Sequence, residues 1–437
     1  MSPTFTASDV AIAQVRPAEW ISPHRFADRH GDLPVPYADD APRVPLDLHA
    51  PGPGFERAGP RAHIAWDPTT VTAAVLSAGG LSPGINDVIR AVVNGLHYHY
   101  GVRRVLGIAN GYAGLVPGVV PIALDPARVR DIHRAGGSIL GTARNKPDLN
   151  VACSTLRALG IDLLFCIGGD GTLRGAHALA ATARARGQAL GVIGVPKTID
   201  NDVPWVDRTF GFDTAVEVAT HAVDAAHVEA EAARGGVGLV RLMGRDAGFI
   251  AAHAALASGD ADAVLVPEVP FTLEGAGGLL VWLEARLAAR DHAVVVVAEG
   301  AGQNLMPAAP AEFDRTGNRL HQDIGLFLRA RIDAHLRQRG IDASLKYIDP
   351  SYLVRAIPAN PGDGIFCAQL GHHAVHAAMA GRTDLVIGLR HGVFTHVPLP
   401  LVAGGLRRID PRGELWRTVL EVTGQPSFAG QAAAAGT

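Results

Sequence analysis

Two aspartates separated by one residue follow a predicted buried strand, where their carboxylates could transfer a proton or bind a metal ion. The apolar run 190–195 predicts the strand, and the loop after it carries Thr198, Asp200 and Asp202. Open α/β sheets bind their ligands at the carboxyl ends of parallel strands. Two carboxylates so close repel each other unless a cation or a proton lies nearby, so the pair suits a general base beside a metal-binding carboxylate. An Asx-rich turn that caps the next helix is the alternative.

Two glycine-rich turns each follow a predicted strand and precede a predicted helix. The first turn, residues 78–84, contains Gly79, and the second, residues 168–172, contains Asp170. This arrangement points backbone N–H groups and a helix N-terminus at an anion, and a carboxylate there can hold Mg²⁺ directly or through water. No GxxxxGK[ST] motif is present, so neither turn is a P-loop. The second turn taken alone also fits NAD kinases and lipid kinases, and glycine can serve only to tighten a turn.

Charged side chains also follow other predicted strands and turns. Arg245 follows the apolar run 237–242, Glu299 follows another apolar run, and Arg144 stands in a polar turn. An arginine at a strand end can neutralise phosphoryl oxygens in a way that the point charge of a lysine does not reproduce. An ion pair with Asp246 is the alternative for Arg245, and a solvated side chain is the alternative for Arg144.

The chain alternates apolar strands and amphipathic helices from about residue 71 onward, which predicts an α/β fold. The pattern predicts two doubly wound, Rossmann-like lobes with the active site in the cleft between them. Residues 1–70, rich in proline and charge, predict an extended N-terminal arm. A helix is expected over 125–135, and 346–363 is expected to be irregular. The expected strands lie at 72–77, 103–108, 162–167, 190–195, 237–242, 263–267, 293–298 and 385–389.

The composition argues against several classes of function. The 437 residues include 39 basic and 42 acidic side chains and carry a net charge of −3, so no nucleic-acid partner is expected. Cys153, Cys166 and Cys367 have no metal-ligand spacing and give no disulfide framework, so we expect a reduced, cytoplasmic setting. The sequence shows neither a signal-peptide pattern nor an uninterrupted apolar run of ~18 residues, so no membrane partner is expected either.

Taken together, the motifs resemble those of 6-phosphofructokinases, most closely the plant-type and related bacterial ATP-dependent branch. They occur in order from near residue 58 to near residue 428. Several long motifs in one order favour the functional interpretations over the alternatives given above. The motifs include GGLSPGINDVIR (79–90), GGDGTLRGA (168–176), GVPKTIDNDVP (194–204), LMGRDAGFIAAHAALASG (242–259), VVVAEGAGQ (295–303) and LKYIDPSYLVRA (345–356).

In that family the γ-phosphoryl group of ATP passes to the carbon-1 hydroxyl of fructose 6-phosphate, with Mg²⁺ as cofactor. The resemblance implies that Asp200 accepts the hydroxyl proton, that Asp202 assists through the metal or its waters, and that Asp170 organises Mg²⁺. It implies further catalytic contacts from Thr198 and Arg245. The implied ATP-binding residues are Gly79, Tyr112, Arg144, Gly169, Asp170, Gly171 and Thr172. The implied sugar-phosphate-binding residues are Thr198, Asp200, Met243, Gly244, Arg245 and Glu299, with Lys346, Tyr352 and Arg355 at the 6-phosphate.

The resemblance also informs the choice of phosphoryl donor. Pyrophosphate users of the family have an aspartate in place of Gly171 and a lysine at the position of Lys197. An aspartate would occupy the space of the α-phosphate of ATP, whereas plant-type ATP enzymes keep the lysine beside a glycine, so ATP is favoured. Pyrophosphate dependence is the alternative. Departures from relatives at Ala113, 143–146 and Gly235 leave open a related sugar phosphate such as sedoheptulose 7-phosphate.

The resemblance further implies the domain limits and the assembly. Residues 71–213 would form the ATP lobe, completed by about 354–390, and residues 214–353 would form the sugar-phosphate lobe, completed by about 391–430. Relatives assemble as homodimers or homotetramers, so a homo-oligomer is expected. A non-catalytic regulatory homologue is an alternative, although every residue expected to do chemistry is present. An NAD-kinase-like enzyme is disfavoured because the PKTIDND and MGR motifs are foreign to that class.

Overall fold

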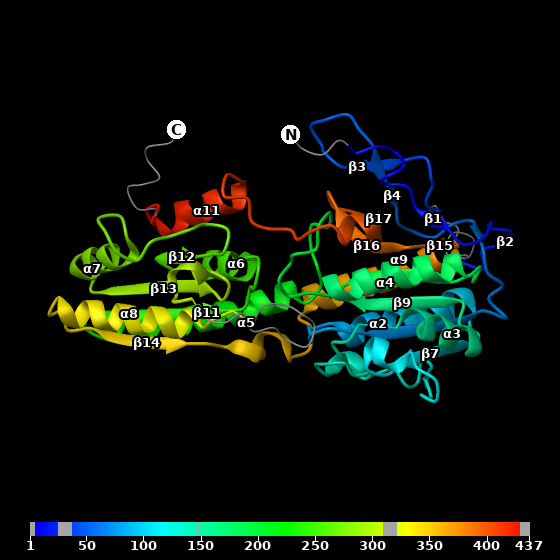
Figure 1. The fold of residues 1–437 in the computed structure, drawn as a ribbon, viewed down its shortest axis with the longest axis horizontal. Helices are drawn as coiled ribbons and strands as arrows, with labels where there is room; N and C mark the ends of the chain where they lie inside the picture. The colour runs from blue at the N-terminus through cyan, green and yellow to red at the C-terminus, as the bar shows by residue number, and fades with distance from the viewer. Residues whose placement is uncertain (1–4, 25–36, 147, 309–320, 429–437) are drawn as a thin grey trace, which may run out of the picture. The chain divides into compact units, whose positions relative to one another are not determined.

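The computed structural model describes residues 5–24, 37–146, 148–308 and 321–428, which form two compact units (Figure 1). Unit 1 comprises residues 1–198, 203–211 and 355–406, and unit 2 comprises residues 199–202, 212–354 and 407–437. The chain therefore passes between the units several times. Within the described ranges, no helix combines the length and the apolar character needed to cross a lipid bilayer.

Unit 1 is built around a nine-stranded mixed sheet. Its central strands run parallel in the order β16 (Leu385–Arg390), β10 (Gly191–Pro196), β9 (Leu163–Gly168), β6 (Thr72–Ser77) and β7 (Arg104–Ile108). Antiparallel strands extend both edges, with β8 (Ile122–Leu124) beside β7 and with β17 (Val393–Pro398), β4 (Gly54–Arg57) and β3 (Arg43–Pro45) beyond β16. Because parallel strands of this kind are covered on both faces, they appear in the sequence as continuous apolar runs.

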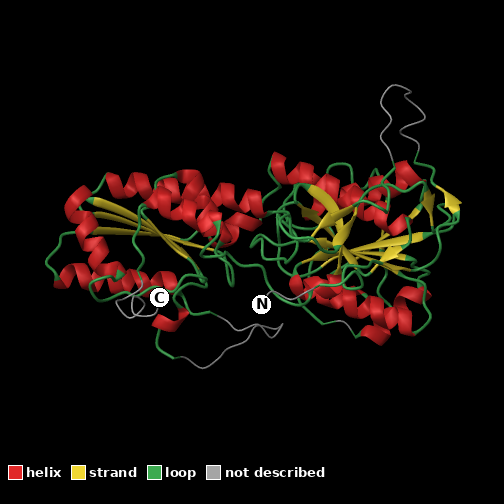
Figure 2. Ribbon diagram, turned by 90° about the horizontal axis from the view of Figure 1, so that it is seen from above, coloured by secondary structure: helices red, strands yellow, loops and turns green. Residues whose placement is uncertain are grey.

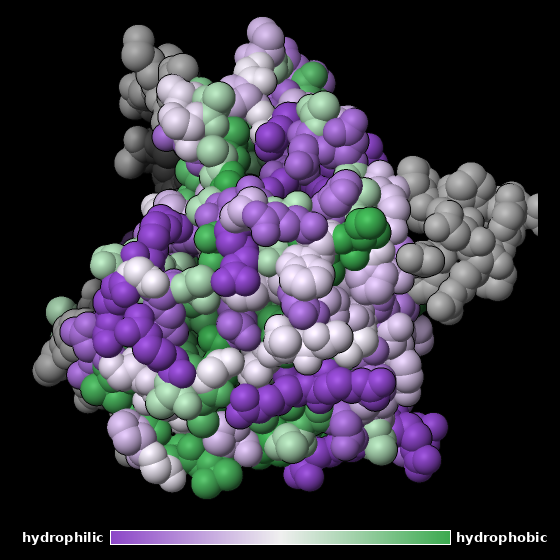
Figure 3. All heavy atoms as spheres, turned by 90° about the vertical axis from the view of Figure 1, so that its right-hand side faces the viewer, coloured by the Kyte–Doolittle hydropathy of each residue, from purple (hydrophilic) through white to green (hydrophobic). Residues whose placement is uncertain are grey.

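Each face of this sheet has its own apolar core, since successive residues of a strand point to opposite faces. In β6, Val75 belongs to one core and Leu76 to the other. Helices α2 (Ile85–Asn94) and α9 (Pro361–Met379) contribute to the first core, and α3 (Leu149–Ala158) and α4 (Asp170–Ala185) contribute to the second. Figure 2 shows helices on both sides of the strands, so unit 1 is doubly wound as predicted. The face seen in Figure 3 is largely hydrophilic, with apolar side chains scattered across it.

Unit 2 contains a four-stranded parallel sheet. Its strand order is β12 (Ala263–Leu265), β13 (His292–Ala298), β11 (Gly236–Leu242) and β14 (Ser344–Ile348). Helices α5 (Phe212–Glu231), α6 (Phe249–Ser258) and α11 (Glu414–Thr423) share one core, and α7 (Leu279–Arg290) and α8 (Ile324–Gln338) share the other. Val296 and Val297 of β13 lie in different cores, so this sheet is also buried on both faces. The predicted Rossmann-like α/β architecture of the second lobe is confirmed.

The described part of the N-terminal arm forms short strands. Besides β3 and β4 in the large sheet, β1 (Ala13–Gln14) pairs with β15 (Arg382–Thr383), and β2 (Trp20–Ile21) pairs with β5 (His63–Ile64). Buried Glu56 of β4 anchors this region through ion pairs with Arg61 (3.0 Å) and Arg382 (2.9 Å). Burial opposes ionisation of Glu56, but a hydrogen bond and the charges of His396 and Arg382 lower its pKa to about 2. Residues 1–4 and 25–36 of the predicted arm lie outside the described residues.

Three local expectations differ from the structure. The stretch 125–135 forms turns and a short 3₁₀ helix, η3 (Ile132–Arg134), instead of the expected helix. The stretch 346–363 contains the end of β14 and a 3₁₀ helix. Residues 391–406 join unit 1 through β17, whereas the sequence assigned them to the second lobe. The remaining short elements are α10 (Leu399–Val402), η1 (Gly95–Tyr100), η2 (Gly111–Gly114), η4 (Gln303–Leu305) and η5 (Ser351–Arg355).

Candidate active site

The first glycine-rich turn gathers basic side chains from distant parts of unit 1. Gly79 follows β6 with a φ of 88°, a conformation that glycine adopts at little cost. The ammonium of Lys197 donates a hydrogen bond to the carbonyl of Gly80 (2.7 Å). A Cβ atom added at Gly80 would lie 3.2 Å from a guanidinium nitrogen of Arg144 and 3.2 Å from one of Arg355. Three cations therefore meet where the chain enters α2, an arrangement that suits a polyphosphate.

The second glycine-rich turn follows β9 and leads into α4, with Gly169 as the N-cap residue. Oδ2 of Asp170 lies 2.7 Å from Nη2 of Arg174 on the next turn of the helix. Burial raises the pKa of the Asp170 carboxyl, and Arg174 offsets part of this rise. A Cβ atom added at Gly171 would meet no atom within 4 Å, so the space beside this residue is open. One added at Gly79 would lie 3.8 Å from the hydroxyl of Thr172, so the two turns are neighbours.

Tyr112, predicted on the nucleotide side, lies beneath the second glycine-rich turn. Its side chain is only 3% exposed, and its hydroxyl donates a hydrogen bond to the carbonyl of Thr172 (2.7 Å). Its ring lies against Gly175, where an added Cβ atom would approach to 2.9 Å. Because it is buried beneath the second turn, Tyr112 supports that turn from inside and offers little surface to a nucleotide.

The loop with the two aspartates joins the units, since unit 1 ends at Thr198 and residues 199–202 belong to unit 2. In unit 1, the carbonyl of Thr198 accepts a hydrogen bond from the hydroxyl of Thr209 (2.7 Å). In unit 2, the carbonyl of Asp202 accepts a hydrogen bond from the N–H of Arg407 (2.8 Å). Both Asp200 and Asp202 are half-buried. The backbone on each side of the loop is thus hydrogen-bonded within its own unit.

The predicted sugar-binding residues of unit 2 lie at the carboxyl ends of two neighbouring strands. Met243, Gly244 and Arg245 follow β11, and Glu299 follows β13. The N–H of Gly300 donates to the carbonyl of Gly244 (3.1 Å), which ties the two strand ends together. A Cβ atom added at Gly300 would lie 1.8 Å from the carbonyl oxygen of Arg245, so this close approach requires glycine.

The three residues predicted at the sugar 6-phosphate fall in different units. Lys346 is exposed on β14, and Tyr352, 65% exposed, lies in η5; both belong to unit 2. Arg355 ends η5 and belongs to unit 1, where its guanidinium lies with Arg144 beside Gly80. Within the described units, Arg355 is therefore grouped with the residues predicted for the phosphoryl chain.

Two charged residues at the unit 2 strand ends were not predicted. Arg241, in β11, forms an ion pair with Glu299 (3.1 Å) and another with Asp349 (2.7 Å), the residue after β14. The only sequence signal for Arg241 is a charged residue inside an otherwise apolar strand. Such a residue usually has a charged partner when it is largely buried.

The carboxylates of the candidate site fit a magnesium ion that is shared with a substrate. Among the described residues, no group of three or more His, Cys, Asp or Glu side chains is arranged to hold a metal ion. Mg²⁺ commonly takes one or two protein carboxylates together with substrate phosphates and waters. A single half-buried aspartate, Asp170, at the N-terminus of α4 and beside the turn that gathers cations, meets that requirement.

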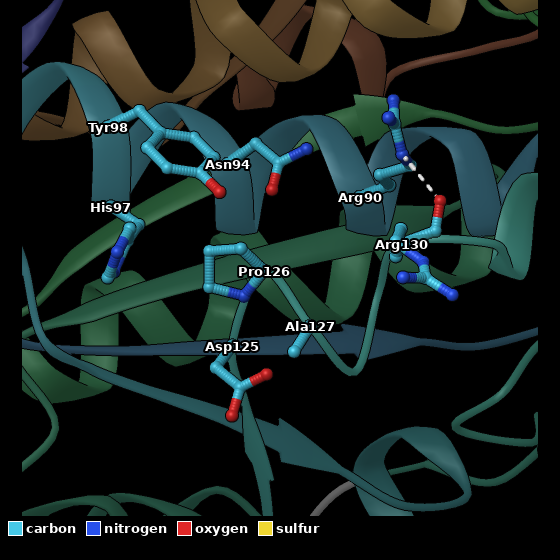
Figure 4. A pocket seen from close by; sticks show the side chains of 8 residues that line it. All are labelled: Arg90, Asn94, His97, Tyr98, Asp125, Pro126, Ala127 and Arg130. Atoms are coloured by element: carbon cyan, nitrogen blue, oxygen red, sulfur yellow. Dashed lines mark hydrogen bonds between the residues drawn. The ribbon is translucent and has the colours of Figure 1, made fainter.

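A pocket of about 520 Å³ lies elsewhere on unit 1 (Figure 4). It is lined by residues of α2, η1 and the turn 125–130, including Arg90 and Tyr98. Nε of Arg90 donates to the carbonyl of Arg130 (3.2 Å), the contact drawn in Figure 4. None of the residues predicted for catalysis or substrate binding lines this pocket, so the candidate active site is distinct from it.

Comparison with known proteins identifies the family. The phosphofructokinase family model matches residues 72–378, from the first residue of β6 into α9. The chain belongs to the phosphofructokinase family. The match covers both glycine-rich turns, the loop with the two aspartates and the strand ends of unit 2, so it includes all the residues predicted for the site.

Relatives of this phosphofructokinase-family chain cover most of its length. It is 46% identical over 441 residues to the ATP-dependent 6-phosphofructokinase of Amycolatopsis methanolica, covering 98% of this chain and 94% of that protein. It is 44% identical to ATP-dependent 6-phosphofructokinase 7 of Arabidopsis thaliana, covering 90% and 82%. It is 46% identical to the ATP-dependent 6-phosphofructokinase of Borreliella burgdorferi, covering 85% of each. The predicted similarity to plant and bacterial ATP-dependent members is confirmed.

Solved structures share the fold of this chain. The chain matches a phosphofructokinase of Pichia pastoris in the T-state with a TM-score of 0.64 and 25% identity, covering 81% of this chain and 39% of that one. It matches the fold of a pyrophosphate-dependent phosphofructokinase from Marinobacter aquaeolei with a TM-score of 0.66 and 24% identity, covering 82% and 92%. At that identity the second match concerns the fold alone.

Proposed function

We propose that the chain transfers the γ-phosphoryl group of ATP to the carbon-1 hydroxyl of fructose 6-phosphate and releases fructose 1,6-bisphosphate. The observation that carries this proposal is the 46% identity to the ATP-dependent 6-phosphofructokinase of Amycolatopsis methanolica over 98% of the chain. The ATP-dependent 6-phosphofructokinases of Arabidopsis thaliana (number 7) and Borreliella burgdorferi are 44% and 46% identical to the chain. The residues that the reaction needs are present in both units.

The nucleotide phosphates bind, in this proposal, to the two glycine-rich turns of unit 1. The backbone of Gly79 lies beside Lys197, and the side chains of Arg144 and Arg355 lie beside Gly80. Phosphoryl transfer needs little covalent help from the protein, because positioning and neutralisation of charge supply most of the catalysis. Cations fixed around a turn at a helix N-terminus provide both.

Mg²⁺, when bound, would supply positive charge that neutralises the phosphates of the nucleotide. Asp170 would hold it together with the phosphates of ATP. The raised pKa of Asp170 stems from burial, and Arg174 opposes the rise. Gly169 and Thr172 shape the turn that presents this carboxylate, and Tyr112 supports the turn through its hydrogen bond to Thr172.

Asp200 acts as the general base in this proposal and accepts the proton of the carbon-1 hydroxyl. A positioned base typically contributes ~10²–10⁴-fold to the rate. Asp202 assists from the same loop, and Thr198 orients the reacting hydroxyl. Arg245 neutralises charge on the phosphoryl group during transfer.

The sugar phosphate binds, in this proposal, at the strand ends of unit 2. Met243, Gly244 and Glu299 contact the sugar, and Lys346 and Tyr352 contact its 6-phosphate. The backbone bonds between the ends of β11 and β13 support this assignment, since they hold these residues on one edge of the sheet.

ATP is favoured over pyrophosphate as the donor. The space beside Gly171 is open, because an added Cβ atom would meet nothing within 4 Å. This space can accept the α-phosphate of ATP, and it supports the assignment that the names of the relatives suggest. The names of the relatives do not favour pyrophosphate or a related sugar phosphate.

On the basis of the family, we also propose the role of each unit, the assembly of the chain and its location in the cell. Unit 1 acts as the ATP lobe and unit 2 as the sugar-phosphate lobe. The chain works as a homodimer or homotetramer in the cytoplasm. Light scattering of the purified protein tests the assembly.

The decisive experiment is a matrix of phosphoryl donors and acceptors. ATP, GTP and pyrophosphate are each tested with fructose 6-phosphate and sedoheptulose 7-phosphate, with and without Mg²⁺. Turnover with ATP, Mg²⁺ and fructose 6-phosphate is expected. Turnover with pyrophosphate and none with ATP would overturn the assignment of ATP as the donor. Binding of fructose 6-phosphate without turnover would support a non-catalytic regulatory homologue.

A further inference from the structure

Arg241 is the centre of a cluster of charges at the carboxyl edge of the unit 2 sheet. Its side chain, 19% exposed, reaches three carboxylates. Nη1 lies 2.7 Å from Oδ2 of Asp349, Nη2 lies 3.1 Å from Oε2 of Glu299, and Nε lies 3.7 Å from Oδ1 of Asp323. Asp349 follows β14, Glu299 follows β13, and Asp323 caps α8. One guanidinium therefore joins the ends of three elements.

We propose that Arg241 is a positioning residue for the sugar-phosphate subsite, a role that rests on the proposed function. It sets the direction of the Glu299 side chain and, through Asp349, the start of the helix that carries Tyr352. It touches neither ATP nor the reacting atoms and acts only through these neighbours.

The backbone at Glu299 is fixed independently of Arg241. The N–H of Glu299 donates to the carbonyl of Leu242 (2.9 Å), and its carbonyl accepts from Nε2 of Gln303 (3.0 Å). These two backbone bonds do not determine the rotamer of the Glu299 side chain. The contact between Oε2 and Nη2 of Arg241 selects one rotamer, so loss of Arg241 frees the side chain without moving the strand end.

Asp349 links Arg241 to the residues proposed to bind the 6-phosphate. Its Oδ2 pairs with Arg241, while its Oδ1 accepts a hydrogen bond from the N–H of Ser351 (2.8 Å), the first residue of η5. Tyr352 is the next residue. The carboxylate of Asp349 therefore connects Arg241 to the segment that presents Tyr352.

A lysine cannot reproduce this arrangement. The planar guanidinium offers donors in fixed directions, so Arg241 pairs with Glu299 and Asp349 at the same time. A lysine ammonium on a flexible stem acts as a point charge. Removal of the positive charge would also leave Glu299, Asp349 and Asp323 to repel one another, since like charges at short range disfavour the ionised forms.

The test compares Arg241→Met and Arg241→Lys with the unchanged protein in steady-state kinetics. Arg241→Met is expected to raise the KM for fructose 6-phosphate about tenfold to a hundredfold, the range typical for loss of a supporting residue around a bound group. The KM for ATP should stay within about twofold, since the contacts of Arg241 all lie in unit 2. Arg241→Lys should give an intermediate KM.

A double-mutant cycle with Glu299→Gln separates positioning from general stabilisation. If Arg241 acts through Glu299, adding Arg241→Met to Glu299→Gln should raise the KM for fructose 6-phosphate much less than it does in the unchanged protein. Multiplicative effects of the two substitutions would overturn the inference, as would a KM for Arg241→Met within twofold of the unchanged value. If the Arg241→Met variant does not fold, the same cycle measured with Arg241→Lys tests whether Arg241 acts through Glu299.

Arg286→Met provides the matched control. Arg286 is similarly buried in unit 2 and pairs with Asp262, away from the strand ends that carry Glu299 and Asp349. Its loss should lower the melting temperature and leave the KM for fructose 6-phosphate unchanged; an equal rise of that KM in this control contradicts the inference. Failure of the proposed function is distinguishable, because the unchanged protein would then not phosphorylate fructose 6-phosphate at all.

Discussion

Lys197 donates a hydrogen bond from its ammonium to the carbonyl of Gly80, 2.7 Å away, although β10 and the first glycine-rich turn are far apart in the chain. The parallel strands β10, β9 and β6 lie side by side, so the residues after β6 and β10 meet at one sheet edge. The lysine is only 4% exposed. Its charge is thus held at the backbone that is proposed to bind the transferring phosphate.

We expect Lys197→Met to lower kcat with ATP by about 10²-fold, the loss typical for one donor that stabilises charge in a transition state. Methionine keeps the length of the stem, so the melting temperature should fall only slightly. A coupled assay and a thermal melt measure the two effects. Lys197→Arg keeps the charge and serves as the control; a kcat for Lys197→Met within twofold of the unchanged value would exclude this role.

Gly171→Asp should shift the donor preference away from ATP. The carboxylate would enter the space proposed for the α-phosphate, and a like charge there costs several kcal/mol, so kcat/KM for ATP should fall at least ~10²-fold. Turnover with pyrophosphate should rise. The fold should tolerate the change, because an added Cβ atom meets nothing within 4 Å and an acid in the first turn of α4 is favourable.

Gly171→Ala is the control for this substitution, since it adds bulk without charge. It should leave kcat/KM for ATP within a few-fold of the unchanged value. If Gly171→Asp retains full activity with ATP, the α-phosphate does not lie beside this residue.

The free energy of unfolding should decrease as the pH falls below 6.5, because unit 1 buries histidines such as His24 and His373. Burial and the charge of His99 lower the pKa of His24 to about 4, and burial and the charge of His396 lower the pKa of His373 to about 4. The unfolded chain binds these protons near pH 6.5, whereas the folded chain does not until about pH 4. Stability present above pH 6.5 is therefore lost as the pH falls toward 4.

Thermal melts between pH 7.5 and about 4.5 measure this dependence. His373→Gln should reduce the fall in melting temperature over that range, because one buried imidazole is removed. His49→Gln, at an exposed position, should leave it unchanged. An unaltered pH dependence in His373→Gln would show that other groups dominate acid unfolding.

The strands that the sequence predicted well are those that both faces of a sheet bury. The run 162–167 corresponds to β9 and the run 237–242 to β11, each shifted by one residue at most, because continuous burial leaves a continuous apolar run. β14 was missed because it is the edge strand of its sheet, half-exposed, and contains Lys346. Its pairing with β11 depends on tertiary contacts that the local pattern does not contain.

The site was predicted from motifs and not from geometry. Asp170 and Lys197 were identified because they belong to recognisable motifs beside predicted strands. The ion pairs of Arg241 could not be predicted, since they depend on the register of β11 against β13 and β14. The burial of Tyr112 beneath the second turn could not be predicted either, because a motif does not reveal which way a ring points.

Tyr112→Phe should lower the free energy of unfolding by about 1 kcal/mol through loss of one buried hydrogen bond. The carbonyl of Thr172 would lose its donor, so the second turn should loosen and the KM for ATP should rise a few-fold. Denaturant titration and steady-state kinetics measure both. Tyr352→Phe, at an exposed position, should leave the unfolding free energy unchanged; an unchanged KM for ATP in Tyr112→Phe would argue against support of the turn.

Asp200→Ala should abolish turnover, with a loss of ~10²–10⁴-fold expected for removal of a general base. Binding of fructose 6-phosphate, measured by isothermal titration calorimetry, should stay within about an order of magnitude, because the sugar contacts are proposed to lie mainly at the strand ends of unit 2.

Asp202→Asn is the comparison for the same loop. Asp202 is proposed to assist and not to accept the proton, so its substitution should cost less in kcat than Asp200→Ala. The carbonyl of Asp202, which accepts from the N–H of Arg407, is retained in the variant, so the loop should keep its path. If Asp200→Ala keeps near-normal kcat while Asp202→Asn loses it, the base is Asp202, and the two carboxylates exchange their roles.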